Sequence, residues 1–259
     1  MNEKQVVVNY TLQPDGTLKL DERPNLPPVK TADSCLYCGS QEDLDNDHVP
    51  PKCIFPKPRP TGLVEVRACR KCNGGASKDD EHFRMMLCLS QDIGETPEAQ
   101  KNWAPIFRSL KRPQARGMMK ALLGSIRPVR AMSWGGVHLG TRMGFKVDLT
   151  RINRVIERTV RGLYFKEMNQ RLPEGYDVTV FCDETLINEL PVILNKLQET
   201  LIIPLAAAPP KIIAPNIFFY RVLIAEDNPA ATAWALTFYE RKSFLAITCP
   251  RPLASHLQC

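Results

Sequence analysis

Two Cys-x-x-Cys pairs constrain this chain more than any other feature of its sequence. Cys35 and Cys38 form the first pair, and Cys69 and Cys72 form the second, after an interval of thirty residues. A two-residue gap lets both sulfur atoms of a pair reach one ion from a tight turn, and four thiolates complete a tetrahedral zinc site with no open position. The spacing therefore predicts a structural Zn²⁺ bound by all four sulfur atoms, with four free thiols as the alternative.

Composition and apolar runs favour a folded chain outside the membrane. Of the 259 residues, 44% are hydrophobic and 24% are charged, as in ordinary globular proteins. The longest apolar run, residues 201–208, contains Pro204 and is too short to span a bilayer. Residues 1–5 lack the basic head of a secretory signal, so we expect a cytoplasmic location, where metal thiolates are favoured over disulfides.

The net charge of +6 is unevenly distributed along the chain. Residues 101–171 contain sixteen Lys or Arg and three acidic residues, a net charge of +13, whereas residues 1–100 carry −4 and residues 172–259 carry −3. A cationic surface binds polyanions because it releases their counterions. The middle of the chain therefore predicts a nucleic-acid partner, with a solvated basic surface as the alternative.

Local patterns divide the chain into four segments. Residues 1–32 predict a hairpin and a proline-rich connector, residues 33–92 a zinc-bound module, residues 93–172 a basic and mainly helical region, and residues 173–259 a mixed α/β region. Within the second segment, a hydroxyl followed by acidic residues predicts a helix that begins at Ser77. The expected fold class is α+β, with the small module preceding the larger mixed region.

The clearest predicted helix runs from Asp148 to Arg171. With residues placed about 100° apart, one stripe of this helix is cationic and another face is apolar. The stripe consists of Arg151, Arg154, Arg158 and Arg161. We expect the apolar face to pack and the arginines to hold a phosphate backbone. Beyond it, the sequence predicts strands at Val178–Phe181, Ile217–Ile224, Ala233–Tyr239 and Ser243–Thr248, and a helix at Glu184–Leu201.

Residues that a structural zinc does not need lie between and just after the cysteine pairs. Asp47 and His48 are adjacent in the intervening segment, and Asn73 directly follows the last cysteine. An imidazole can take a proton from water near neutral pH. Carboxylate and amide oxygens suit Mg²⁺. In this pattern the chain resembles the HNH, or ββα-metal, endonucleases, and in particular their zinc-stapled branch, which includes phage endonuclease VII.

The resemblance covers roughly residues 33–90 and implies a treble-clef-like ββα-metal module. It implies that His48 is the general base and that Asp47 and Asn73 hold a catalytic Mg²⁺ or Mn²⁺. The implied activity is hydrolysis of phosphodiester bonds in nucleic acid, with DNA as the implied substrate; no residue distinguishes DNA from RNA. Many HNH proteins fix the active-site loop with a middle asparagine, but residues 49–68 contain none.

Two other functions remain open at this stage. A non-catalytic zinc-binding nucleic-acid adaptor would use the same cysteines and basic segment but would not need Asp47, His48 and Asn73. A protein-interaction zinc module would not explain the +13 segment. The C-terminal region has three possible roles, which are selecting substrate, forming a homodimer and sensing a partner. Lys52, Lys78 and His82 flank the predicted site, His82 as a further ligand, a phosphate contact or an ordinary polar surface residue.

Overall fold

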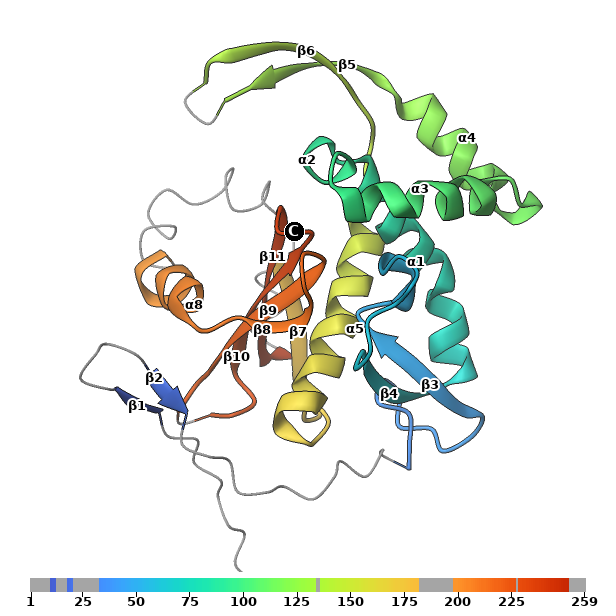
Figure 1. Ribbon diagram of the computed structural model, residues 1–259. Coiled ribbons are helices and arrows are strands. Elements are labelled where there is room, and N and C mark those ends of the chain that lie inside the picture. Colours follow the sequence, from blue (N-terminus) through green and yellow to red (C-terminus); the bar gives the residue numbers. More distant parts are fainter. Residues whose placement is uncertain are drawn as a thin grey trace, which may run out of the picture.

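A computed structural model describes residues 10–12, 18–20, 33–133, 136–181, 198–226 and 228–251, and its fold mixes helices and antiparallel sheets (Figure 1). The predicted connector in segment 1–32 and nearly all of the predicted helix Glu184–Leu201 lie outside these ranges. The predicted N-terminal hairpin is present: β1 (Tyr10–Leu12) pairs antiparallel with β2 (Leu18–Leu20). Within the described ranges no helix combines the length and apolar character needed to cross a membrane.

The cysteine-containing segment folds as a two-stranded hairpin followed by a helix. Strand β3 (Leu44–Val49) pairs antiparallel with β4 (Val64–Cys69), and helix α1 (Arg70–Leu89) begins at the next residue. A loop with five prolines between residues 50 and 60 connects the two strands and contains one short 3₁₀ turn, η1 (Lys52–Ile54). This order, strand, strand and helix, places both cysteine pairs at the same end of the hairpin.

Helix α1 begins seven residues earlier than its sequence pattern predicts. Ser77, the predicted cap, lies inside the helix, and its hydroxyl donates to the carbonyl of Gly74 at 3.0 Å. Glycines disfavour a helix interior by about 1 kcal/mol each, but here the chain is fixed before them. The amide of Arg70 donates to the carbonyl of Asp43 at 3.0 Å, and Cys69 and Cys72 belong to the cysteine cluster. Tertiary anchoring therefore overrides local propensity.

The basic segment after α1 forms an arm, residues 97–147, whose first helix packs against α1 with Ala99 and Ile106 buried. Beyond the short helix α2 (Gln91–Gly94), it consists of α3 (Pro97–Leu110), the 3₁₀ turn η2 (Pro113–Ala115), α4 (Arg116–Ser125), β5 (Arg127–Met132) and β6 (His138–Gly144). Strands β5 and β6 form a separate two-stranded ribbon that extends away from the body of the molecule (Figure 1). The sequence predicted helical structure up to residue 130; Pro128 lies instead in β5.

Helix α5 (Leu149–Met168) matches the clearest sequence prediction. The side chain of Asp148 caps it by accepting from the amide of Arg151 at 3.3 Å. All four strands predicted after it are present, together with β8, which was not predicted. They form an antiparallel sheet in the order β7 (Tyr176–Phe181), β11 (Lys242–Pro250), β10 (Thr232–Phe238), β9 (Phe218–Ile224) and β8 (Lys211–Ala214). The turn η3 (Gln198–Ile202) and helix α8 (Ile203–Ala207) precede β8.

Helix α5 lies between the α1 hairpin unit and the C-terminal sheet, and it packs against both (Figure 1). One hydrophobic cluster includes Val49 and Phe83 from the first unit, Val155 from α5 and Trp234 from the sheet. One hydrophobic core therefore continues across the predicted segment boundaries at residues 92 and 172. Packing on both sides holds the cysteine-containing unit against a large scaffold.

Gly162 allows the close approach of α5 and β3. A Cβ atom at this position would lie 2.5 Å from a methyl carbon of Val49, which is itself buried. We expect Gly162→Ala to lower the free energy of unfolding by about 1–3 kcal/mol because the core has no room for the added methyl group. The matched control is Gly124→Ala in α4, where nothing lies within 4 Å. Thermal unfolding should show no loss for the control, and equal behaviour of the two variants would contradict the packing argument.

Candidate metal centre and adjoining cleft

The four predicted cysteines converge at one end of the β3–β4 hairpin. The sulfur atoms of Cys35, Cys38, Cys69 and Cys72 all lie within 4.8 Å of one another. The sulfur atoms of Cys38 and Cys69 are 3.6 Å apart. Tetrahedral zinc with Zn–S bonds of about 2.3 Å separates its sulfur ligands by about 3.8 Å. The cluster therefore fits a four-coordinate metal ion such as zinc. It is the only group of cysteine, histidine or acidic side chains in the described chain that could hold a metal ion.

Local backbone structure supports the first cysteine pair. Gly39 adopts a φ of +79°, a conformation that favours glycine, and its amide donates to the carbonyl of Cys35 at 2.9 Å. Burial raises the pKa of Cys35, but hydrogen bonds from the backbone of Cys69, Cys38 and Tyr37 outweigh it and lower the pKa to about 7. This turn therefore stabilises a thiolate, the form that binds metal.

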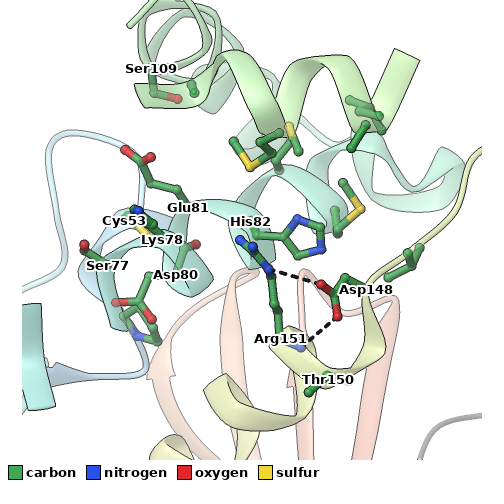
Figure 2. Close-up of a pocket in the computed structure, with 18 of the residues that line it drawn as sticks. Cys53, Ser77, Lys78, Asp80, Glu81, His82, Ser109, Asp148, Thr150 and Arg151 are labelled. Atoms are coloured by element: carbon green, nitrogen blue, oxygen red, sulfur yellow. Dashed lines mark hydrogen bonds and ion pairs between the residues drawn. The ribbon is translucent and has the colours of Figure 1, made fainter. Parts of the chain in front are cut away.

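A cleft of about 1270 Å³ lies beside the hairpin and α1 (Figure 2). Its lining includes Asp47, His48 and Asn73, the three residues predicted to act together, and Met118 and Lys146 from the arm. The predicted flanking lysines, Lys52 and Lys78, also line the cleft.

His48 is held by a carboxylate that the sequence did not identify. It lies directly across the ladder from Glu65, and its Nε2 is 3.3 Å from Glu65 Oε1. Glu65 Oε2 also accepts from the side chain of Asn46 at 2.8 Å, which fixes the carboxylate. The two side chains form an ion pair when the imidazole is protonated. Glu65 was not identified from the sequence, and only strand register could have paired it with His48.

Asn73 lies in the first turn of α1, against strand β3. Its Nδ2 donates to the backbone carbonyl of Asn46 at 3.4 Å. This contact uses the amide nitrogen, and Oδ1 has no hydrogen-bond partner in the part of the chain that the structure describes. The side chain therefore presents an oxygen ligand at the edge of the cleft.

Asp47 does not project as the open metal ligand that the sequence predicts. Strand β3 is regular, so Asp47 and His48 point to opposite faces, and Asp47 is 6% exposed. Its Oδ2 accepts from Arg158 Nη2 at 2.7 Å and from the Tyr37 hydroxyl at 2.8 Å. Only Oδ1 has no partner in the described chain. Asp47 therefore lies at the centre of a buried polar network. Only its Oδ1 atom is left to bind a cation.

The arginine stripe of α5 was expected to hold a phosphate backbone, but its side chains contact carboxylates of the same chain. Each of its four members pairs with a carboxylate of the same chain: Arg151 with Asp148 at 3.1 Å, Arg154 with Asp79 at 2.7 Å, Arg158 with Asp47 at 2.7 Å, and Arg161 with Asp177 at 3.1 Å. Arg158 also pairs with Asp80 at 2.9 Å and lies over the Tyr37 ring. The stripe therefore joins α5 to α1 and its neighbours, and it is not a free cationic surface for phosphates.

The network places one guanidinium between two carboxylates. Burial raises the pKa of Asp80 to about 6; Arg158 lowers the pKa and nearby Asp47 raises it, so the guanidinium does not fully compensate for burial. The protonated form of Asp80 is thus more favoured in the folded chain than in the unfolded chain. Stability from this group is present at low pH and is lost as pH rises toward 6.

Asp80→Asn should isolate this pH dependence. The variant keeps the shape of the side chain but does not ionise. Between pH 4 and pH 7 we expect the wild type to lose about 1–3 kcal/mol of unfolding free energy that the variant does not lose. The reason is that only the wild type loses the bound proton over this range. Urea unfolding at several pH values gives this difference directly. A constant difference between the two proteins across that range would contradict the raised pKa of Asp80.

His82 is buried, contrary to its reading as a polar surface residue. It is 7% exposed, and its Nε2 has no hydrogen-bond partner in the described residues. Figure 2 places it on the cleft wall near Arg151 and Asp148. Burial and the charge of Arg151 lower its pKa, so the neutral ring is favoured. His82 therefore lines the cleft as a neutral side chain.

Comparisons with known proteins assign no family to this arrangement. No protein-family model matches the chain, and neither a curated protein nor a solved structure matches it. The fold and the site by themselves define a mixed α/β protein with a four-cysteine cluster that can hold a metal such as zinc. Function has to be argued from the cleft and its charges.

Proposed function

We propose that this protein is a zinc-stapled endonuclease of the HNH type that hydrolyses phosphodiester bonds, with DNA as its substrate. The observation that carries the proposal is the pairing of His48 with Glu65 in a cleft that also contains Asn73, beside the cysteine cluster. A purely structural zinc site has no use for an oriented imidazole next to an amide oxygen. The order of two strands and a helix is also the one that the resemblance implies.

His48 would act as the general base. In its neutral form the ring accepts a proton from a water molecule, and the resulting hydroxide attacks phosphorus. The Glu65 carboxylate stabilises the imidazolium that forms and holds the ring in one orientation, as carboxylates do in other acid–base pairs. Phosphodiester hydrolysis gains most from such positioning and from charge stabilisation.

Asp47 and Asn73 would hold a divalent ion through their remaining oxygen atoms. Bound Mg²⁺ or Mn²⁺ would stabilise the charge that develops on the departing oxygen. The guanidinium of Arg158, 2.7 Å from the same carboxylate, opposes a second cation there. Mg²⁺ sites in nucleic-acid enzymes commonly take one or two protein oxygens and the substrate phosphate. We therefore expect the protein to bind this ion strongly only when nucleic acid is present.

The cleft walls favour a phosphate backbone. Lys52 and Lys78 lie on the side of His48, and Arg112 and Lys146 lie on the side of the arm; all four are exposed. Acidic residues also line the cleft, and Arg112 pairs with one of them, Glu81. The exposed lysines are therefore the cations that would attract a polyanion. This arrangement supports a nucleic-acid strand as the molecule that brings its phosphate to His48.

The test is cleavage by the purified, zinc-containing protein. Supercoiled plasmid, single-stranded DNA and RNA are each incubated with Mg²⁺, with Mn²⁺ and without added divalent ion. We expect nicked or linear DNA only when the divalent ion is present, and a His48→Ala preparation purified identically excludes a contaminating nuclease. Absence of cleavage under every condition would contradict the proposal.

One observation favours a second candidate, the non-catalytic nucleic-acid adaptor. The Asp47 carboxylate is already compensated by Arg158 and bound by Tyr37, so among the described residues it does not form an open divalent-ion site. An adaptor would bind nucleic acid tightly and leave it intact. The cleavage assay distinguishes the two functions when binding is measured in the same samples.

A further inference from the structure

The cationic residues without acidic partners are concentrated on the arm, residues 97–147. Between residues 101 and 147 the chain has ten Lys or Arg and no Asp or Glu, and all ten are exposed: Lys101, Arg108, Lys111, Arg112, Arg116, Lys120, Arg127, Arg130, Arg142 and Lys146. Within the described chain one of them forms an ion pair, Arg112 with Glu81 at 3.3 Å. On α5, by contrast, all four arginines of the stripe are paired. The arm is therefore a surface with many unpaired cations that an anionic partner can reach.

The ribbon formed by β5 and β6 is open on both faces. Apart from each other, the two strands make only slight contact with any described element. Valine, leucine and methionine side chains on the ribbon are exposed, among them Val129, Leu139 and Met143. A two-stranded ribbon on its own is marginally stable in water. A partner that covers the ribbon would bury these side chains and stabilise it.

Arginines project from both faces of the ribbon. Arg142 lies opposite Val129 in the ladder and so shares a face with Arg127, whereas Arg130 points to the other face. A flat partner would reach one set only. A groove with phosphates along both walls would reach both sets, and the major groove of B-form DNA, about 12 Å wide, admits a two-stranded ribbon.

Other partners suit this surface less well. A second copy of the chain would bring the same positive charge. Duplex RNA has a major groove too deep and narrow for protein side chains to read. Proteins that bind single strands stack bases on aromatic side chains, and β5 and β6 contain no Phe, Tyr or Trp. Charge and shape together favour duplex DNA.

We propose that the arm holds duplex DNA, with the β5–β6 ribbon in the major groove. Arm residues such as Met118 and Lys146 line the same cleft as His48, so DNA bound along the arm would continue into that cleft. This last step rests on the proposed nuclease function, whereas the binding itself does not. The arm would thus select the double-stranded form of the substrate.

The test compares two triple variants of the full-length, zinc-containing protein. One carries Arg127→Gln, Arg130→Gln and Arg142→Gln on the ribbon. The matched control carries Lys57→Gln, Arg59→Gln and Arg241→Gln, which removes the same charge from exposed positions off the arm. Fluorescence anisotropy with a labelled duplex of about 30 base pairs, three helical turns, measures affinity without added divalent ion. Titrations at about 50 to 200 mM salt give the dependence of affinity on salt.

We expect the ribbon variant to bind the duplex on the order of 10- to 100-fold more weakly, with a salt slope reduced by about 3, roughly 0.9 for each lost phosphate contact. The control variant should match the wild type. Hydrogen exchange provides a test without mutation: duplex DNA should protect the amides of β5 and β6. Wild-type affinity in the ribbon variant, absence of protection, or stronger binding to single strands, duplex RNA or anionic lipid vesicles would each overturn the inference. Duplex binding through the ribbon without any cleavage would support it and contradict only the nuclease.

Discussion

Replacing His48 by alanine is expected to slow cleavage by about 10²- to 10⁴-fold, the usual contribution of a general base. The loss should appear in kcat, because the imidazole acts on the attacking water and not on the rest of the substrate. The fold should be unaffected, since the side chain lies at the cleft surface and its polar contact in the described chain is with exposed Glu65. Single-turnover cleavage at saturating DNA measures the chemical step directly.

Two further variants make this test specific. Glu65→Gln keeps the size of the side chain but removes the charge that stabilises the imidazolium, so the rate should fall by a smaller factor than in His48→Ala. Glu174→Gln makes the same change at an exposed glutamate outside both the cleft and the arm and should leave the rate at saturating DNA unchanged. Full activity in His48→Ala would remove this residue from the mechanism. Equal losses in the three variants would indicate a general structural effect.

Loss of the cysteine-bound metal is expected to unfold the hairpin and the start of α1. The second hydrophobic cluster of the described chain has only three buried members, Cys35, Ala68 and Cys69, so few apolar contacts hold this end together. Structural zinc contributes on the order of 10 kcal/mol to small zinc-bound units. We expect one zinc ion per chain, and in Cys69→Ser a loss of zinc together with a loss of more than about 5 kcal/mol in unfolding free energy.

The matched control for this prediction is Cys249→Ser. This cysteine is also buried, but it lies in β11 and contacts Thr179 instead of a sulfur atom. It should retain zinc and lose about 1–2 kcal/mol at most. Metal analysis and thermal unfolding of both variants suffice. A Cys69→Ser protein that keeps its metal content and its melting temperature would contradict the four-cysteine site.

Much of the fold follows from patterns that are local in sequence. Three predictions of this kind are confirmed. The two cysteine pairs come together, a helix begins after Asp148, and alternating strands follow residue 176. Each depends on the spacing of a few neighbouring residues, because local backbone geometry fixes the directions in which their side chains point. The start of α1 was wrong because anchoring at Arg70 and the cysteines offsets the cost of two glycines.

The sequence identified three residues that line one cleft but not the contacts that each of them makes. Sequence brought Asp47, His48 and Asn73 to attention, and the structure places all three on one cleft. It could not assign Glu65 to His48, because that contact depends on the register of two strands joined by a long irregular loop. It also assigned the arginine stripe to nucleic acid, since helical periodicity reports which residues share a face but not what that face meets.

The sequence by itself therefore determined the four-thiolate cluster, the helical and strand segments with regular periodicity, and the concentration of positive charge in the middle of the chain. Only the tertiary structure decided which of those charges are free. Arg158 meets Asp47 from 111 residues away and Arg154 meets Asp79 from 75 residues away, whereas the arginines of the ribbon meet no carboxylate within the described residues. Ion pairing depends on distance through space, and the folded chain alone sets that distance.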